Sequence, residues 1–264
     1  MPALERSRRP RRVRGALLGP MAAAVLGAAP APAALAAPNE IKVFTDELAA
    51  PGEVMVETHV NDVRLQPAAE GTSRRQTLQV MPEFSYGLAP GWEASVQLPI
   101  ARVAGGGWIG NGARVELQHV AAHAASVGFY WGVNVELARI ARADVAAFTD
   151  LELVPILGWR GGRWHLAANP TLVRRLSGSE RRVGFEPAAK LAYGLSGSHA
   201  LGLEAYLERG PFTQPLPGRA QYRMVYATWD FRLGGADVNL GVGRGYSPAS
   251  DQRVLKAIVE WALD

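Results

Sequence analysis

The segment DLELVPILGWRGGRWHLAANPTL, residues 150–172, contains two stretches in which apolar residues alternate with polar or small ones. The pair Gly161-Gly162 between them tolerates the positive φ angles of a type I′ turn, so the segment predicts a β-hairpin. With this turn, Trp159 lies opposite Trp164, and both strands present their apolar residues on one side. Each stretch has about ten residues, the length of a tilted strand that crosses a bilayer. The two tryptophans flank the turn, where the aromatic girdle of a membrane barrel lies.

The same unit recurs along the chain and predicts twelve strands. We expect them at 53–61, 76–88, 92–100, 114–122, 127–138, in the two arms of the hairpin, and at 183–195, 199–208, 221–233, 236–243 and 253–263. The connections alternate strictly in length. Short ones lie at 89–91, 123–126, 161–162, 196–198 and 234–235, and long ones at 62–75, 101–113, 139–149, 173–182, 209–220 and 244–252.

An even strand number with alternating short and long connections is typical of outer-membrane proteins, whose short turns face the periplasm. The sequence therefore predicts an all-β fold, a transmembrane antiparallel up-and-down β-barrel of about 12 strands with both ends on the periplasmic side. Prolines inside the expected strands each remove a ladder hydrogen bond, and we expect them at bulges. They are Pro82, Pro99, Pro155, Pro170 and Pro187.

The first 36 residues have the composition of a signal peptide. A basic region (Arg6 to Arg14) precedes an apolar region (Gly15 to Ala29) and the A-x-A motif Ala34-Leu35-Ala36, so the mature chain is expected to start at Ala37. The alternative is a disordered basic tail. We expect a signal peptide at 1–36, a periplasmic lead-in at 37–52 and an outer-membrane barrel at 53–264. The sequence leaves open whether the lead-in enters the lumen.

Charge and cysteine content exclude some classes of function. Of the 28 basic and 24 acidic residues, six arginines and one glutamate belong to the leader, so the rest of the chain is nearly neutral. This composition gives no support for nucleic-acid binding. The absence of cysteine excludes disulfides and thiolate metal sites.

Strand alternation alone does not say which face of a barrel is apolar. Export, an interior too wide for one apolar layer, and a polar face rich in Gly and Ala all favour a membrane-spanning barrel with the apolar face outward. Apolar-face aromatics gather near the short turns, as in a girdle at the lipid headgroups. They are Tyr86, Trp92, Phe129, Trp159, Trp164, Tyr193, Phe231 and Trp261.

Arginines gather instead at the long connections. The set comprises Arg74, Arg75, Arg102, Arg114, Arg139, Arg142, Arg174, Arg175, Arg181, Arg182, Arg219, Arg223, Arg244 and Arg253. Guanidinium groups bind phosphate in bidentate fashion. This asymmetry predicts contact with outer-membrane lipid and lipopolysaccharide. The alternative is ordinary solvated loops.

The polar face supplies the candidates for lining the lumen, and acids predominate among them. The set comprises Glu57, Glu83, Glu93, Glu116, Glu136, Glu152, Glu186, Lys190, Glu204, Asp230 and Arg232. Strand register pairs Lys190 with Glu204, and Arg232 with Asp237. One interpretation is a charged pore or substrate passage. The other is a structural network of ion pairs that fills a narrow lumen.

Neither a cofactor site nor a catalytic site is indicated. His119 and His123 are four residues apart, but they lie near a strand end without a third ligand nearby, so we expect no metal there. The Gly105–Gly107 run lacks the strand-to-helix context of a phosphate loop. There is no G-x-S-x-G elbow, and no Ser-Asn-containing strand motif resembles those of the twelve-stranded outer-membrane phospholipases. We therefore expect a protein that is not an enzyme.

Three segments after the leader carry a family resemblance: GLAPGWEASVQLPI (Gly87–Ile100), VEL (135–137) and LKAIVEWAL (Leu255–Leu263). In these segments the chain resembles the transporter-like outer-membrane proteins grouped with the meta-pathway phenol-degradation proteins. The resemblance implies passage of small, often hydrophobic, compounds across the outer membrane. With the polar face, it predicts a porin-like channel or uptake protein for a small-molecule solute. The alternatives are a non-conducting structural or adhesive barrel and, third, an outer-membrane enzyme.

Overall fold

A computed structural model of the chain describes residues 40–64, 76–103, 105–121, 127–141, 146–177 and 182–263. The predicted signal peptide and its cleavage site lie outside these ranges. The strands are β1 (Val54–Arg64), β2 (Gln76–Ala89), β3 (Trp92–Gln97), β4 (Ile100–Val103), β5 (Trp108–Gly110), β6 (Gly112–Val120), β7 (Gly128–Ile140), β8 (Phe148–Gly161), β9 (Trp164–Arg175), β10 (Val183–Ser196), β11 (His199–Glu208), β12 (Tyr222–Leu233), β13 (Ala236–Gly245) and β14 (Arg253–Leu263).

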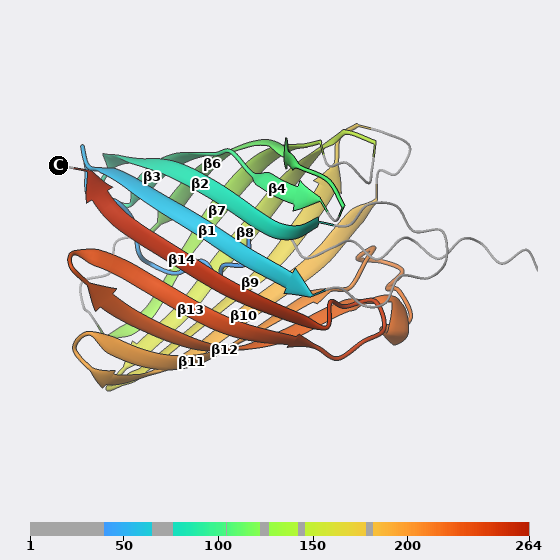
Figure 1. Cartoon of the computed structure of the whole chain (residues 1–264). Helices are drawn as coiled ribbons and strands as arrows, with labels where there is room; N and C mark the ends of the chain where they lie inside the picture. The colour runs from blue at the N-terminus through green and yellow to red at the C-terminus, as the bar shows by residue number, and fades with distance from the viewer. Residues whose placement is uncertain are drawn as a thin grey trace, which may run out of the picture. The chain divides into compact units, whose positions relative to one another are not determined.

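These segments form one antiparallel sheet that closes on itself (Figure 1). β2 pairs with both β3 and β4, β3 then pairs with β6 and β4 with β5, and the other strands pair with their sequence neighbours. β1 pairs with both β2 and β14, which closes the barrel. The pairs β3–β4 and β5–β6 are each one barrel strand with a break, so the 14 segments make 12 barrel strands. The predicted twelve-stranded antiparallel barrel is confirmed. In the described ranges the only helix is the 3-10 turn at Gly218–Ala220.

None of the helical residues that the structure describes belongs to a segment long and apolar enough to cross a bilayer.

The register of the β8–β9 hairpin differs from the prediction by two residues. Gly161 pairs with Trp164 and Trp159 with Leu166, so the turn residues are Gly162 and Arg163. Only Gly162 has a positive φ, of 60°, which fits a type II′ turn with glycine first rather than type I′. A side chain on Gly161 would meet the Trp159 ring. A shift by two keeps the parity of side chains, so the predicted faces are unchanged.

The prolines lie mostly at breaks in the ladder and not at bulges, which corrects the prediction. Pro99 separates β3 from β4. Pro155 and Pro170 lie where the β8–β9 pairing is interrupted, between Leu153 and Leu157 on β8. Pro82 and Pro187 lie in continuous registers with β1 and β9. On the other side, Pro82 faces the break between β3 and β4, and Pro187 lies just past the end of the β10–β11 register. The strands tolerate these missing donors because the pairing is interrupted or ends on one side of each proline.

Most connections opposite the short turns are shorter than predicted because the strands continue into them; the exception is the β11–β12 connection, 209–221. The expected loop 101–113 contains the β4–β5 pairing, and only residues 104–107 separate the two strands. Likewise β8 begins at Phe148 and β9 ends at Arg175. We call the two ends of the barrel the short-turn end and the long-loop end. The short-turn end contains Val54 of β1 beside Leu263 of β14.

Candidate functional site

The two faces of the barrel wall differ in polarity as the alternation predicts. Large apolar side chains such as Trp131, Leu203 and Val242 point outward and are more than half exposed. Interior side chains are buried and mostly polar, and they include Gln97, Asn134 and Asn169. An apolar exterior around a polar interior is the arrangement of a barrel that spans a membrane.

The structure places the predicted lumen residues on the interior wall in two groups. Those near the short-turn end border a cavity: Glu57, Glu83, Glu93, Lys190, Glu204, Asp230 and Arg232. The others, Glu116, Glu136, Glu152 and Glu186, lie on the inner faces of β6, β7, β8 and β10. Arg232 differs from the rest because its side chain is 65% exposed, at the rim of the barrel. The register pairs Lys190–Glu204 and Arg232–Asp237 are confirmed.

The predicted girdle residues lie close to the short-turn end. Tyr86, Trp92, Phe129, Trp164 and Trp261 are exposed, whereas Trp159, Tyr193 and Phe231 are half-buried. Several contact neighbouring rings. Trp164 on β9 meets Tyr193 on β10 edge-to-face with ring centroids 4.8 Å apart, and Phe231 meets Trp229, two residues earlier on β12, at 4.4 Å. Trp229 belongs to the same aromatic band and was not among the predicted residues.

Two residues have positions that the sequence did not indicate. Arg114, predicted as the first residue of the strand 114–122 at its long-loop end, lies in β6, but its side chain is buried inside the lumen with Nη1 3.2 Å from Glu136. Since its guanidinium faces interior acids, it contributes no charge to the outer loops. His119 stacks on Trp92 and its Nδ1 lies 2.8 Å from the Gly91 carbonyl oxygen. Its proposed neighbour His123 lies outside the described residues.

Residues 40–50, which we call the N-terminal segment, run through the lumen toward the short-turn end. Near the start of the segment, Lys256 donates a hydrogen bond of 3.0 Å to the carbonyl oxygen of Ile41. Midway, the amide of Phe44 donates to Asn169 Oδ1 at 2.8 Å. The segment forms no strand of its own, so it is held by the interior side chains of the wall.

Charged contacts hold both ends of the N-terminal segment. Lys42 forms an ion pair of 2.8 Å with Glu57. Arg160 binds Asp46 through Nη2 at 2.6 Å and Nε at 3.1 Å, and it also reaches Glu47. This fork geometry is the one in which arginine binds a carboxylate most strongly.

Apolar contacts anchor two further residues of the segment: Ile41, directly before Lys42, and Phe44, between the two ion-paired positions. Ile41 packs with residues of β1, β12 and β14, namely Val63, Tyr222, Met224, Tyr226 and Val254. Phe44 packs with Tyr130, Val154 and Ile156. Both clusters are interior, so the segment packs against side chains of the wall inside the lumen.

Burial and pairing shift the titration of the segment's charged groups. Burial raises the pKa of Glu40 to about 7, and the charge of Glu136 adds to the rise. Burial opposes the charge on Lys42, yet Glu57 and Glu83 hold its pKa well above the usual value. For Asp46, burial also acts against ionisation, but hydrogen bonding and charge from Arg160 lower the pKa.

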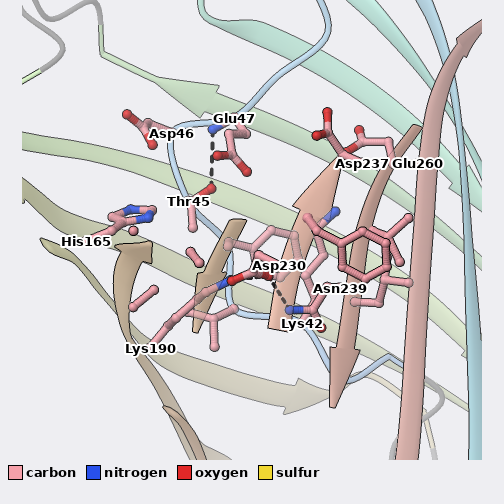
Figure 2. Close-up of a pocket in the computed structure, with 18 of the residues that line it drawn as sticks. Lys42, Thr45, Asp46, Glu47, His165, Lys190, Asp230, Asp237, Asn239 and Glu260 are labelled. Atoms are coloured by element: carbon pink, nitrogen blue, oxygen red, sulfur yellow. Dashed lines mark hydrogen bonds and ion pairs between the residues drawn. The ribbon is translucent and has the colours of Figure 1, made fainter. Parts of the chain in front are cut away.

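A cavity of about 910 Å³ remains between the segment and the wall (Figure 2). Its lining includes turn residues 161–163 and 194–197, which places it at the short-turn end. Figure 2 shows Asp46 and His165 on one side and Lys190, Asp230 and Asn239 on another. Lys190 lies 3.0 Å from Asp230, and Asn239 also donates to this carboxylate. The cavity is polar, charged and large enough for a small solute.

Two triads of interior side chains have the spacing of metal ligands. They are Glu40 with His59 and Glu83, and Glu40 with Glu116 and Glu136; within each triad the potential ligand atoms lie within 4.8 Å of one another. Glu40 belongs to both triads and is the only member on the N-terminal segment. The sequence did not indicate either group, because strand spacing brings these residues together only when the barrel closes.

No family model matches the sequence, and no curated protein does. Among solved structures, the chain is similar to the COG4313 outer membrane channel from Pseudomonas putida F1, with 12% sequence identity and a TM-score of 0.65. That match covers 85% of this chain and 100% of the other. The chain is also similar to the KdgM porin, with 12% identity and a TM-score of 0.55 over 80% of this chain and 99% of that chain. Identities this low establish the fold alone.

The closed barrel, its apolar exterior and these structural neighbours define the class of the protein, which is an outer-membrane β-barrel. Its location is the bacterial outer membrane, as the sequence predicted.

Proposed function

We propose that the protein is an outer-membrane channel for small polar solutes, closed in this structure by its N-terminal segment. The observation that supports this most is the charged cavity of about 910 Å³ inside the wall at the short-turn end. Among the described residues, its lining includes no residue from the long connections. The N-terminal segment and the apolar clusters around Ile41 and Phe44 lie in the remaining lumen.

Displacement of the segment is compatible with an intact wall. Residues 40–50 share no sheet ladder with the barrel in the described ranges, so their release breaks side-chain contacts and leaves every strand pairing in place. Outward movement would join the cavity to the other end of the lumen. The predicted lumen residues would then line the path, and the excess of acids would favour cations over anions.

The cavity lining favours a polar solute over a hydrophobic one. Lys190, Asp230 and Asn239 offer paired charges and an amide. An apolar compound would desolvate these groups without replacing their hydrogen bonds, which is unfavourable. The resemblance to the meta-pathway group implies hydrophobic compounds, whereas the cavity lining favours polar ones. We therefore propose small solutes that are polar or amphipathic.

Single-channel recording in planar bilayers tests this function. We expect discrete current steps with a modest preference for cations, measured as a reversal potential under a salt gradient. Because the chain has no cysteine, Asp230→Cys provides a single reactive thiol, and a bulky thiol reagent should reduce the current. Leu203→Cys on the outer face is the control and should be unaffected. A reconstituted, folded barrel without current would favour the non-conducting structural barrel.

A further inference from the structure

We propose that the lumen holds a divalent cation of the calcium class between Glu40 of the N-terminal segment and Glu116 and Glu136 of the barrel wall. The oxygens of these three carboxylates lie within 4.8 Å of one another. Oxygens around one Ca²⁺, each at about 2.3–2.6 Å, can be up to about 5 Å apart. The spacing therefore suits one ion held by all three side chains.

When ionised, this group carries an excess of negative charge. Arg114 lies 3.3 Å from Glu40 and 3.2 Å from Glu136, and no other basic side chain among the described residues is within ion-pair distance of the triad. Three ionised carboxylates and one guanidinium carry a net charge of −2. The adjacent Glu57 and Glu83 have their own bases, Lys42 and His59. A divalent ion would neutralise the triad, and burial of unpaired charge is otherwise strongly unfavourable.

Glu116 shows the lack of a balancing positive charge most clearly. It is buried, and within the described part of the chain it accepts hydrogen bonds only from neutral groups: Gln97 Nε2 at 2.6 Å, Asn134 Nδ2 at 3.2 Å and Ser95 Oγ at 3.4 Å. A carboxylate enclosed in this way has donors to orient it but no positive charge to balance it.

Unsatisfied oxygens in the same place point to a ligand. Gln97 and Asn134 are fully buried, and their amide groups end at Glu116, yet Gln97 Oε1 and Asn134 Oδ1 have no hydrogen-bond partner. The second carboxylate oxygen of Glu40, Oε1, is also buried without a partner. Buried acceptors of this kind are rarely left unsatisfied. Carboxylate oxygens are ligands that Ca²⁺ takes in proteins, and the unpartnered Oε1 of Glu40 belongs to a member of the triad itself.

The consequence is a metal link between the wall and the segment that closes the lumen. Glu116 and Glu136 pair across β6 and β7, so they form a rigid platform, whereas Glu40 comes from the segment. Bound cation would hold residue 40 in place, in addition to the contacts at Ile41 and Phe44. The inference goes beyond the proposed function, because cation binding in detergent does not require conduction.

Titration of the purified, chelator-treated full barrel with Ca²⁺ tests the site. We expect saturable binding of one ion per chain by isothermal titration calorimetry. Glu116→Gln and Glu40→Gln should each weaken it by at least about 100-fold, since loss of even an outer partner costs about 10–100-fold. Glu186→Gln, an interior carboxylate outside the triad, is the matched control and should bind like the wild type.

A structural readout accompanies the binding measurement. Ca²⁺ should slow amide hydrogen exchange at residues 40–44 in the wild type but not in Glu116→Gln, with heat-modifiable migration on gels showing that each barrel is folded. Glu40→Gln leaves the wall unchanged, so it remains informative if Glu116→Gln misfolds. Absence of saturable binding, or binding that both substitutions leave intact, would overturn the proposal.

Discussion

Arg160 is the residue that ties the barrel wall most firmly to the N-terminal segment at the short-turn end. Its guanidinium makes hydrogen bonds to both oxygens of Asp46 and one to Glu47. The side chain is 29% exposed, so solvent screens the pair in part. Nevertheless, three charge-assisted hydrogen bonds from one side chain stabilise the docked segment more than a single exposed ion pair would.

Arg160→Ala is expected to loosen the segment without unfolding the barrel. Buried hydrogen bonds to charged groups each stabilise a structure by about 1.5–3 kcal/mol, and these partly exposed ones contribute less. A loss of about 1.4 kcal/mol of docking free energy would raise the exchange rate of the segment's amides about tenfold. Hydrogen–deuterium exchange with mass spectrometry measures this for residues 40–50. Arg232→Ala is the control, because Arg232 pairs with Asp237 on the rim of the wall. Equal exchange in Arg160→Ala and wild type would show that this contact does not hold the segment.

The lowered pKa of Asp46 predicts that acid releases the segment. Because the docked carboxyl has a pKa below its usual 3.8, ionised Asp46 favours docking. This contribution is complete above the usual pKa and is lost as pH falls through the lowered one. Arg160, His165 and Tyr130 face Asp46 from β8, β9 and β7, and Glu47 follows it in the chain.

A spin label at Leu48→Cys, read by electron paramagnetic resonance from neutral pH to about pH 2.5, measures this release. We expect the label to become mobile only at acidic pH below the usual aspartate range. Asp46→Asn is the matched control and should lack this acid-dependent step. A step of the same size in both proteins would assign the release to another group.

At the residue scale, the sequence predicted which side chains face inward but not which residues they contact. Interior parity follows from alternation, so Glu57 and Glu204 could be placed. The partners of Arg160 and Asn169 could not, since they come from residues more than 100 positions away in a segment without periodicity. The turn was predicted one residue too early, at 161–162 instead of 162–163. A type I′ turn with both glycines and a type II′ turn with Gly162 first are both compatible with the sequence.

The barrel strands are the elements that the sequence predicted best. Their boundaries fall within a few residues of the alternating stretches, because lipid outside and a polar interior enforce a strict period of two. The strands extend further toward the long-loop end than predicted, as β4 and β5 show. Past the apolar band the alternation no longer reports on lipid contact, so the sequence signal weakens there while the hydrogen-bonded ladder continues.

Substitution on the outer face tests the strand assignment. Leu203 lies halfway along β11, pairs with Leu191 and Ala227, and is 55% exposed. Leu203→Arg should lower the free energy of unfolding by about 2–4 kcal/mol, the cost of arginine at the bilayer midplane. Ala200→Arg, on the cavity face beside Asp230, should change it little. Equal losses in a lipid refolding assay would contradict the assigned faces.

The N-terminal segment is the element whose course the sequence left open. Residues 40–50 contain Ile41 and Phe44, but neither alternation nor helical spacing indicates where they pack. One signal was present: interior acids outnumber interior bases on the wall, so additional positive groups were needed. Lys42 meets part of that need, and only the closed barrel shows it.

On the scale of the whole molecule, alternation of connection length determines the orientation in the membrane. The short turns and the paired ends of β1 and β14 lie at one end, and connections such as 209–221 lie at the other. Outer-membrane barrels place short turns in the periplasm. We therefore predict that the cavity opens toward the periplasm and that the long connections face the cell exterior.

Cysteine labelling of intact cells tests this orientation. The chain has no cysteine, so Thr213→Cys in the β11–β12 connection and Ser198→Cys in the β10–β11 turn each introduce one thiol. Both positions are exposed. A membrane-impermeant maleimide should label the first on intact cells and the second only after the outer membrane is opened. The reverse pattern would invert the topology.

The central claim is that the N-terminal segment closes a conducting barrel, and a reversible covalent lock tests it most directly. The amide of Phe44 bonds to the short side chain of Asn169 at 2.8 Å, so Phe44→Cys with Asn169→Cys places two thiols near enough for a disulfide. Arg160→Ala is added to favour release once the lock is reduced. Single-channel current is recorded from the oxidised protein and again after reductant is added. We predict a closed baseline while the disulfide is intact and discrete conducting steps after reduction. The same current in both states, with the disulfide verified by mass spectrometry, would contradict closure by the segment.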